Sequence, residues 1–232
     1  MLRLITDFDG PIMDVSDRYY SVYKMCLQKH KNPDREIKQL SKSEFWQLKR
    51  SQTPETKIGR ISGLDEKRAE LFAKMRRETV HQLEHLDKDI PHPTAIETLE
   101  KIQKLGFDLA VMTMRREKEL LAALDRYNLH KYFDRDRRYF LDNEYVKTGD
   151  VKDKPLLMAR ALKELPPVED IWMVGDTEAD IVAAKTHDIK VIGVLSGIRS
   201  QNNLEKHQPD YIVNDLDSAL ELIKEKTKID SL

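Results

Sequence analysis

The sequence predicts an α/β fold in which helices cover both faces of a parallel β-sheet and a smaller helical domain is inserted into that core. Short apolar runs with strand character alternate with amphipathic, helix-like stretches, a pattern typical of parallel sheets. One interval breaks the alternation. About a hundred residues separate the first strand-like run from the next, whereas a βαβ unit needs about thirty. An inserted domain accounts for this interval.

The predicted strands share short aliphatic or aromatic runs bounded by turn or helix signals. They are Leu2–Thr6, Asp108–Thr113, Ile171–Val174, Lys190–Leu195 and Tyr211–Val213, with a weaker candidate at Arg138–Leu141. Helices are expected between the later strands, at Glu117–Tyr127, Pro155–Leu165 and Ala179–Thr186.

The inserted segment, residues 15–89, is charged and has apolar positions at helical spacing, as in the stretch Leu64–Leu86. Repeated apolar positions favour a folded helical unit over a long flexible loop. We therefore predict a core domain of residues 1–14 and 90–232 and a helical domain of residues 15–89. The sequence Pro91-His92-Pro93 is expected to close the insertion.

Composition narrows the classes of function. The 40 basic and 41 acidic residues nearly balance, so no strong overall field would attract nucleic acid or a membrane surface. Cys26 is the single cysteine, which favours a reducing compartment and, within a probable helix, a packed rather than a reactive thiol. No apolar stretch is long enough for a signal peptide or a membrane span. We expect a cytoplasmic protein with no nucleic-acid or membrane partner.

Two aspartates follow the first predicted strand. Asp7 and Asp9 lie in the motif Asp7-Phe8-Asp9-Gly10-Pro11, and strand alternation puts them on the same side of the chain. Carboxylates this close repel each other unless a proton or a cation lies between them, and Mg²⁺ prefers such oxygen ligands. The alternative is a solvated acidic turn.

A second acidic pair follows the predicted strand Ile171–Val174. Asp176 lies where this strand gives way to a helix, and Asp180 lies one turn later on the same face. Asp176 or Thr177 also has the position of a helix N-cap, and capping is compatible with a metal site. Open α/β sheets bind ligands at the carboxyl edge, so we expect a cation to bridge Asp7 and Asp176 there.

Two further positions complete a candidate phosphate site at that edge. Thr113 ends a predicted strand, so its hydroxyl and the following backbone N–H groups, beginning with Met114, are placed to bind phosphate oxygens. Lys154 supplies positive charge, and Pro155 is expected at the first position of the next helix. A strand-ending threonine and a surface lysine are ordinary by themselves, and they matter here because they accompany two acidic pairs.

Four motifs of the chain, in order, resemble those of the haloacid dehalogenase superfamily: Asp7-x-Asp9-Gly10, the strand-ending Thr113, Lys154-Pro155 and the Gly175–Asp180 segment. The resemblance covers residues 1–13 and 91–197. It implies a Rossmann-like core with Asp7 and Asp176 on adjacent strands that flank a topological switch point. It also implies a helical cap inserted after the first motif, where residues 15–89 stand.

By this resemblance the protein is a Mg²⁺-dependent phosphatase. Asp7 would attack phosphorus and form an aspartyl-phosphate, while Asp9 would protonate the leaving oxygen and then activate water. The Asp7 carboxylate, the Asp9 backbone carbonyl and Asp176 would bind Mg²⁺, with Asp180 in support. The phosphoryl group would be bound by Thr113, Met114 and Lys154.

The chain departs from the family pattern at two places in the site. Pro11 replaces the usual threonine, and Met114 stands where asparagine is common. Arg115 and Arg116 follow, and either is a candidate contact for a second anionic group of the substrate; the alternative is that both begin the next helix and face water. In the helical domain the polar candidates for the cleft are Tyr19, Tyr20, Lys49, Arg50 and Arg60, while Phe45 and Trp46 are expected in its core.

The expected substrate is a small phosphorylated metabolite, and the protein is expected to be a monomer or a homodimer. A phosphomutase of the same superfamily and a non-catalytic phospho-ligand-binding protein remain alternatives. A receiver-type signalling domain also combines Asp, Thr and Lys with Mg²⁺, but its phosphorylated Asp follows the third strand and it lacks a large insertion.

Overall fold

The computed structural model describes residues 1–33 and 36–229, and the chain divides into two compact units. The core unit consists of Met1–Asp14, Pro91–Gly197 and Gln201–Leu232, and the helical unit consists of Val15–Ile90 and Ile198–Ser200. The predicted division, at 14/15 and 89/90, differs from this one by one residue at the second junction and by the short segment Ile198–Ser200.

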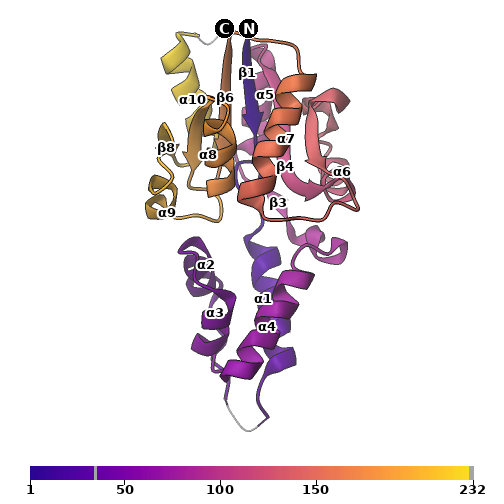
Figure 1. The fold of residues 1–232 in the computed structure, drawn as a ribbon, viewed down its shortest axis with the longest axis vertical. Coiled ribbons are helices and arrows are strands. Elements are labelled where there is room, and N and C mark those ends of the chain that lie inside the picture. Colours follow the sequence, from indigo (N-terminus) through magenta and orange to yellow (C-terminus); the bar gives the residue numbers. More distant parts are fainter. Residues whose placement is uncertain (34–35, 230–232) are drawn as a thin grey trace. The chain divides into compact units, whose positions relative to one another are not determined.

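The core unit contains a six-stranded sheet in the order β5-β4-β1-β6-β7-β8 (Figure 1). Its strands are β1 (Leu2–Thr6), β4 (Asp108–Arg116), β5 (Arg138–Leu141), β6 (Asp170–Gly175), β7 (Lys190–Val194) and β8 (Tyr211–Val213). All neighbouring strands pair in parallel. The predicted α/β fold with a parallel sheet is therefore confirmed.

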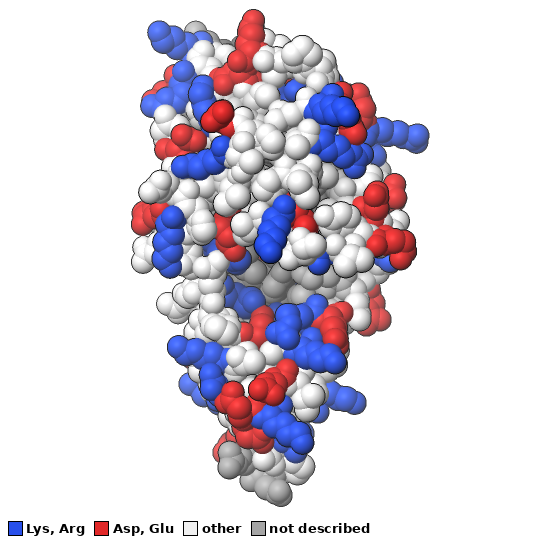
Figure 2. All heavy atoms as spheres, viewed as in Figure 1, with Lys and Arg blue, Asp and Glu red and all other residues white. Residues whose placement is uncertain are grey.

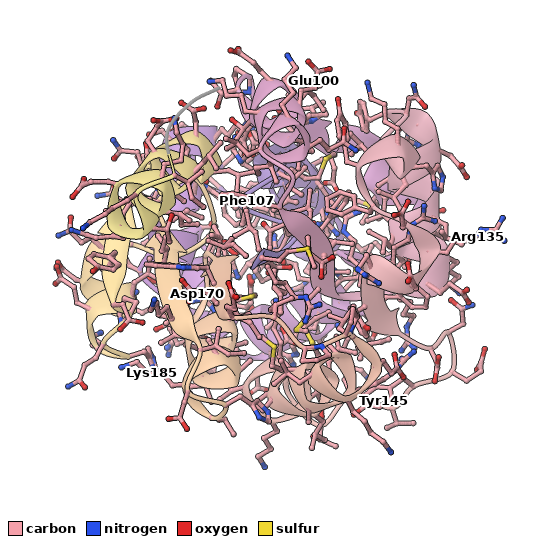
Figure 3. The ribbon with its side chains drawn as sticks, turned by 90° about the horizontal axis from the view of Figure 1, so that it is seen from above. Glu100, Phe107, Arg135, Tyr145, Asp170 and Lys185 are labelled. Carbon is pink, nitrogen blue, oxygen red and sulfur yellow. The ribbon has the colours of Figure 1, made fainter. Side chains whose placement is uncertain are left out.

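Helices cover both faces of this sheet. On one face α5 (Ala95–Lys104) packs beside α10 (Leu216–Thr227), and on the other α7 (Asp150–Glu164) packs beside α8 (Glu178–Lys185). Figure 3 shows Glu100, on α5, and Lys185, at the end of α8, on opposite sides of the sheet. The remaining helices are α6 (Glu117–Arg126), α9 (Gln201–Glu205) and the short 3-10 helices η2 (His130–Tyr132) and η3 (Arg135–Arg137). Aliphatic side chains of the strands and of α7 and α8 form one buried cluster beneath the second face.

Two element boundaries near the site differ from the predicted ones. Strand β4 does not end at Thr113: it continues to Arg116, which pairs with Leu141 of β5 after a shift in register. Helix α7 begins at Asp150 rather than at Pro155. The reason is Asp153, whose carboxylate accepts the N–H groups of Thr148 and Gly149, at 2.8 and 3.1 Å, and so fixes the helix start earlier.

The helical unit is built from α1 (Ser16–His30), α2 (Lys42–Arg50), α3 (Glu55–Ile61) and α4 (Glu66–Thr79), followed by the 3-10 helix η1 (Leu83–Lys88). A capping box starts α2, in which Ser41 and Glu44 exchange side chain to backbone hydrogen bonds. The rings of Tyr23 and Phe45 stack 4.7 Å apart in its core. Phe45 is buried and Trp46 packs against the same cluster, so both lie where the sequence predicted.

The chain leaves and re-enters the core through two short paired strands, β2 (Met13–Asp14) and β3 (Ile90–Pro91). Basic and acidic side chains are interspersed on the face shown in Figure 2, consistent with the balanced charge of the sequence. Within the part of the chain that the structure describes, every helix is too short or too polar to cross a membrane.

Candidate active site

The predicted acidic pairs lie at the carboxyl edge of the sheet, where the strand order reverses. The chain runs from β1 to β4 and β5 on one side and then returns to β6 on the other side of β1. Such a switch point is where open α/β sheets bind ligands. Asp7 follows β1 and Asp176 follows β6, and the Asp7 N–H donates to the Val174 carbonyl at 2.8 Å.

Three buried carboxylates meet at this edge. Asp7, Asp176 and Asp180 are 7%, 3% and 0% exposed, and one oxygen from each lies within 4.8 Å of the others. The buried ammonium of Lys154 lies 2.9 Å from Asp7 Oδ2 and 2.5 Å from Asp180 Oδ1. With all three carboxylates ionised, three negative groups and one positive group give the cluster two excess negative charges. An all-oxygen donor set with this excess fits a hard divalent cation.

Burial and neighbouring charges shift the pKa of Asp7 and that of Lys154. Burial is the main cause that raises the pKa of Asp7 well above its usual range; Lys154 opposes it, while Asp180, Asp176 and Asp9 raise it further. Burial alone would lower the pKa of Lys154, but Asp180 and Asp7 outweigh this effect and raise it. Lys154 therefore stays charged.

Local hydrogen bonds orient the carboxylates. Asp7 Oδ1 accepts the N–H of Phe8 at 2.7 Å. Asp180 Oδ2 accepts the N–H and the hydroxyl of Thr177, at 3.0 and 2.7 Å, in the capping box that starts α8. The capping expected at this helix is thus performed by Thr177 and Asp180, and it points the other Asp180 oxygen at Lys154.

Glycines make room for the two carboxylates of the Gly175–Asp180 motif. A Cβ at Gly197 or Gly10 would lie 1.8 or 2.3 Å from the Asp176 carboxylate, and one at Gly175 would lie 2.1 Å from that of Asp180. Gly10 also has φ +89°, which favours glycine. The sequence prediction did not single out Gly175 and Gly197. The available signal was that Gly175 directly follows one predicted strand and Gly197 closely follows the next strand along the chain, at the same edge of the sheet.

A second group of contacts joins the first motif to β4. Arg115 donates from Nε and Nη2 to Asp9 Oδ1, at 2.8 and 2.6 Å, and its guanidinium lies 5.1 Å from the Phe8 ring centroid. The buried Thr113 hydroxyl accepts the Arg115 N–H at 3.1 Å. The sequence prediction missed the contact between Arg115 and Asp9, because 106 positions separate the two residues.

The other two residues predicted near the phosphate lie as follows. Met114 is half-buried between Thr113 and Arg115. Arg116 donates to the carbonyls of Asp142 and Asn143, at 3.1 and 2.6 Å. Because Arg116 directly precedes α6, these hydrogen bonds connect the loop after β5 to the start of that helix. A substrate contact by Arg115 or Arg116 stays a prediction.

The chain belongs to the haloacid dehalogenase-like hydrolase family, whose model it matches over residues 4–194. It is 29% identical over 159 residues to a phosphoglycolate phosphatase of Vibrio parahaemolyticus, an alignment that spans 66% of this chain and 63% of the relative. It is 27% identical to a pyrophosphatase of Halalkalibacterium halodurans, over 71% of this chain and 74% of that protein.

Solved structures share the fold. A haloacid dehalogenase-like family hydrolase from Streptococcus pneumoniae superposes with a TM-score of 0.67 at 18% identity, over 95% of this chain and 97% of that chain. A hydrolase from Pseudomonas syringae superposes with a TM-score of 0.61 at 20% identity, over 97% and 99%.

Proposed function

We propose that this chain is a Mg²⁺-dependent phosphomonoesterase that acts on a small phosphorylated metabolite through an aspartyl-phosphate on Asp7. The buried cluster in which Asp7, Asp176 and Asp180 outnumber Lys154 is the observation that carries the proposal. Relatives named phosphoglycolate phosphatase and pyrophosphatase support it. Phosphoglycolate and pyrophosphate each carry a second anionic group beside the phosphoryl group that is removed: a carboxylate in the first and a second phosphate in the other.

The metal site of this proposal uses the Asp7 and Asp176 carboxylates and the Asp9 backbone carbonyl. Asp180 supports it by holding Lys154 and Thr177. Bound Mg²⁺ supplies positive charge that allows the nucleophile and the phosphoryl oxygens to approach each other. The Lys154 ammonium, 2.9 Å from Asp7 Oδ2, adds charge of the same sign.

In the proposed reaction an oxygen of the Asp7 carboxylate attacks phosphorus, while the bond from phosphorus to the leaving oxygen breaks. Asp9 gives its proton to that oxygen. As a carboxylate, Asp9 then takes a proton from the water that attacks the aspartyl-phosphate, which restores Asp7 and releases phosphate. Thr113 and the Met114 N–H bind phosphoryl oxygens.

The test is release of inorganic phosphate from phosphorylated metabolites, with Mg²⁺ or with EDTA, by the wild type and Asp7→Asn. Turnover should require Mg²⁺ and should fall at least about a thousandfold in Asp7→Asn, because an amide is a poor nucleophile. Asp134→Asn, at an exposed position of the core unit, is the matched control and should keep full activity.

Turnover that survives in EDTA or in a folded Asp7→Asn would contradict the proposal. Isomerisation of a sugar phosphate without phosphate release, followed by ³¹P NMR, would instead favour a phosphomutase.

A further inference from the structure

The helical unit contains a pocket of its own. Its volume is about 190 Å³, enough for an anion of several heavy atoms, since a water molecule occupies about 30 Å³ in the liquid. Residues of all four helices and of the turn after α4 line it: Tyr19, Lys49, Glu55, Arg76, Arg77, Val80 and His81.

The charges in this pocket do not balance. Lys49 Nζ and Arg76 Nε both pair with the single carboxylate of Glu55, the latter at 2.9 Å. These three side chains are only 16%, 1% and 13% exposed, respectively. Arg77, at the rim, has no carboxylate partner in the described part of the chain. Two buried cations thus share one carboxylate and exposed Arg77 adds a third positive charge, so the buried groups carry an unbalanced positive charge, which is costly.

The neighbouring groups hold the two buried cations in place without neutralising them. Arg76 Nη1 donates to the Tyr19 carbonyl at 2.9 Å. The Tyr19 ring lies 5.8 Å from the Arg76 guanidinium and 5.7 Å from Lys49 Nζ. Such contacts with an aromatic face are weakly attractive but add no negative charge. Burial lowers the pKa of Lys49, and Glu55 does not fully restore it.

We propose that this pocket binds a small carboxylate or phosphate group through Lys49, Arg76 and Arg77. A bound anion would supply the missing negative charge, and the guanidinium fork suits both kinds of group. All residues that line the pocket belong to the helical unit, so the proposed ligand is a free anion with a carboxylate or phosphate group.

Binding is tested by calorimetric titration of the full chain with malonate in the presence of EDTA, so that the metal site takes no part. The wild type should bind malonate, and Lys49→Met and Arg77→Gln should each weaken binding at least about tenfold. Arg77 is exposed, so its replacement does not endanger folding. Lys57→Met, at an exposed position of α3, is the matched control and should bind as the wild type does.

A wild type that does not bind malonate, or variants that bind it equally well, would overturn the proposal. Calorimetry decides this even if no phosphoester is hydrolysed, so failure of the proposed function would be recognised separately.

Discussion

The guanidinium of Arg115 donates two hydrogen bonds to one oxygen of the Asp9 carboxylate, with Nε at 2.8 Å and Nη2 at 2.6 Å from Oδ1. Arg115 is nearly buried, while Asp9 is a quarter exposed. The side chain of Arg115 is fixed by the end of β4 and by the Phe8 ring beneath it. Arg115, at the end of β4, therefore binds one oxygen of Asp9 and so orients the Asp9 carboxylate.

We expect Arg115→Met to slow turnover about 10- to 100-fold, because a misdirected Asp9 meets the leaving oxygen poorly. The loss should be largest for alkyl phosphates, whose leaving group needs a proton, and smallest for p-nitrophenyl phosphate, whose leaving group does not. Steady-state kinetics on both substrates measure the difference. Equal losses on both would show that Arg115 acts on the phosphoryl group instead. Arg135→Met is the control, since Arg135 is exposed and points away from the core unit in Figure 3.

Gly197 is expected to be needed for the metal site. An alanine Cβ there would lie 1.8 Å from Asp176 Oδ2, so the carboxylate must move. We expect Gly197→Ala to lower Mg²⁺ affinity and activity at least about 100-fold, with a loss of stability of about 1–3 kcal/mol from overpacking. Calorimetric Mg²⁺ titration and thermal unfolding measure the two effects. Gln201→Ala, at a nearby exposed position, should change neither. Normal Mg²⁺ binding by Gly197→Ala would refute the assignment of Asp176 as a ligand.

Local patterns in the sequence predicted the sheet and the acidic edge. Apolar runs locate strands such as Leu2–Thr6 because a buried parallel strand needs no polar face. Once the strands are known, the topology of a parallel sheet brings their carboxyl ends to one edge, so Asp7 and Asp176 could be placed at the same edge. That their strands are neighbours, as β1 and β6 are, was implied by the family resemblance.

Features that depend on distant partners were not predictable. The end of β4 depends on pairing with Leu141 of β5, and the contact between Arg115 and Asp9 joins two different strands. The early start of α7 depends on Asp153 acting as a cap from inside the helix. Periodicity records none of these contacts: the first two join separate strands, and the third is a single local cap that leaves no repeating pattern in the sequence.

Asp108 should be a major source of stability in the core unit. Its carboxylate accepts Arg3 Nη2 at 2.5 Å and Arg137 Nε at 2.6 Å, and the Arg3 side chain is 1% exposed. We expect Asp108→Asn to lower the free energy of unfolding by about 3 kcal/mol at pH 7, because it leaves buried Arg3 without its charge partner. Urea unfolding measures this. Glu169→Gln, whose carboxylate forms an exposed ion pair with the N-terminus, should cost almost nothing.

The Asp108 effect should depend on pH. Burial would raise the pKa of Asp108, but hydrogen bonds from Arg137 and Arg3 outweigh it, so the pKa is lowered in the folded state. A lowered pKa stabilises the fold above the unfolded value, near 3.9, and this stabilisation is lost as the pH falls through the folded pKa. The difference between wild type and Asp108→Asn should thus stay constant from pH 7 to about pH 5 and shrink below about pH 4. A difference that grows on acidification would contradict this account.

Cys26 should report the opening of the helical unit. The thiol is fully buried, and burial raises its pKa to about 11, so little reactive thiolate exists at neutral pH. We expect 5,5′-dithiobis(2-nitrobenzoate) to label native protein at pH 8 at least about 100-fold more slowly than protein in 6 M guanidinium chloride.

Ser43→Cys adds a thiol at an exposed position and should show an additional fast phase. Leu27→Ala removes a buried neighbour from the same cluster and should speed the labelling of Cys26, because a destabilised unit opens more often. Native Cys26 labelled as fast as the thiol that Ser43→Cys introduces would show that the helical unit does not enclose it.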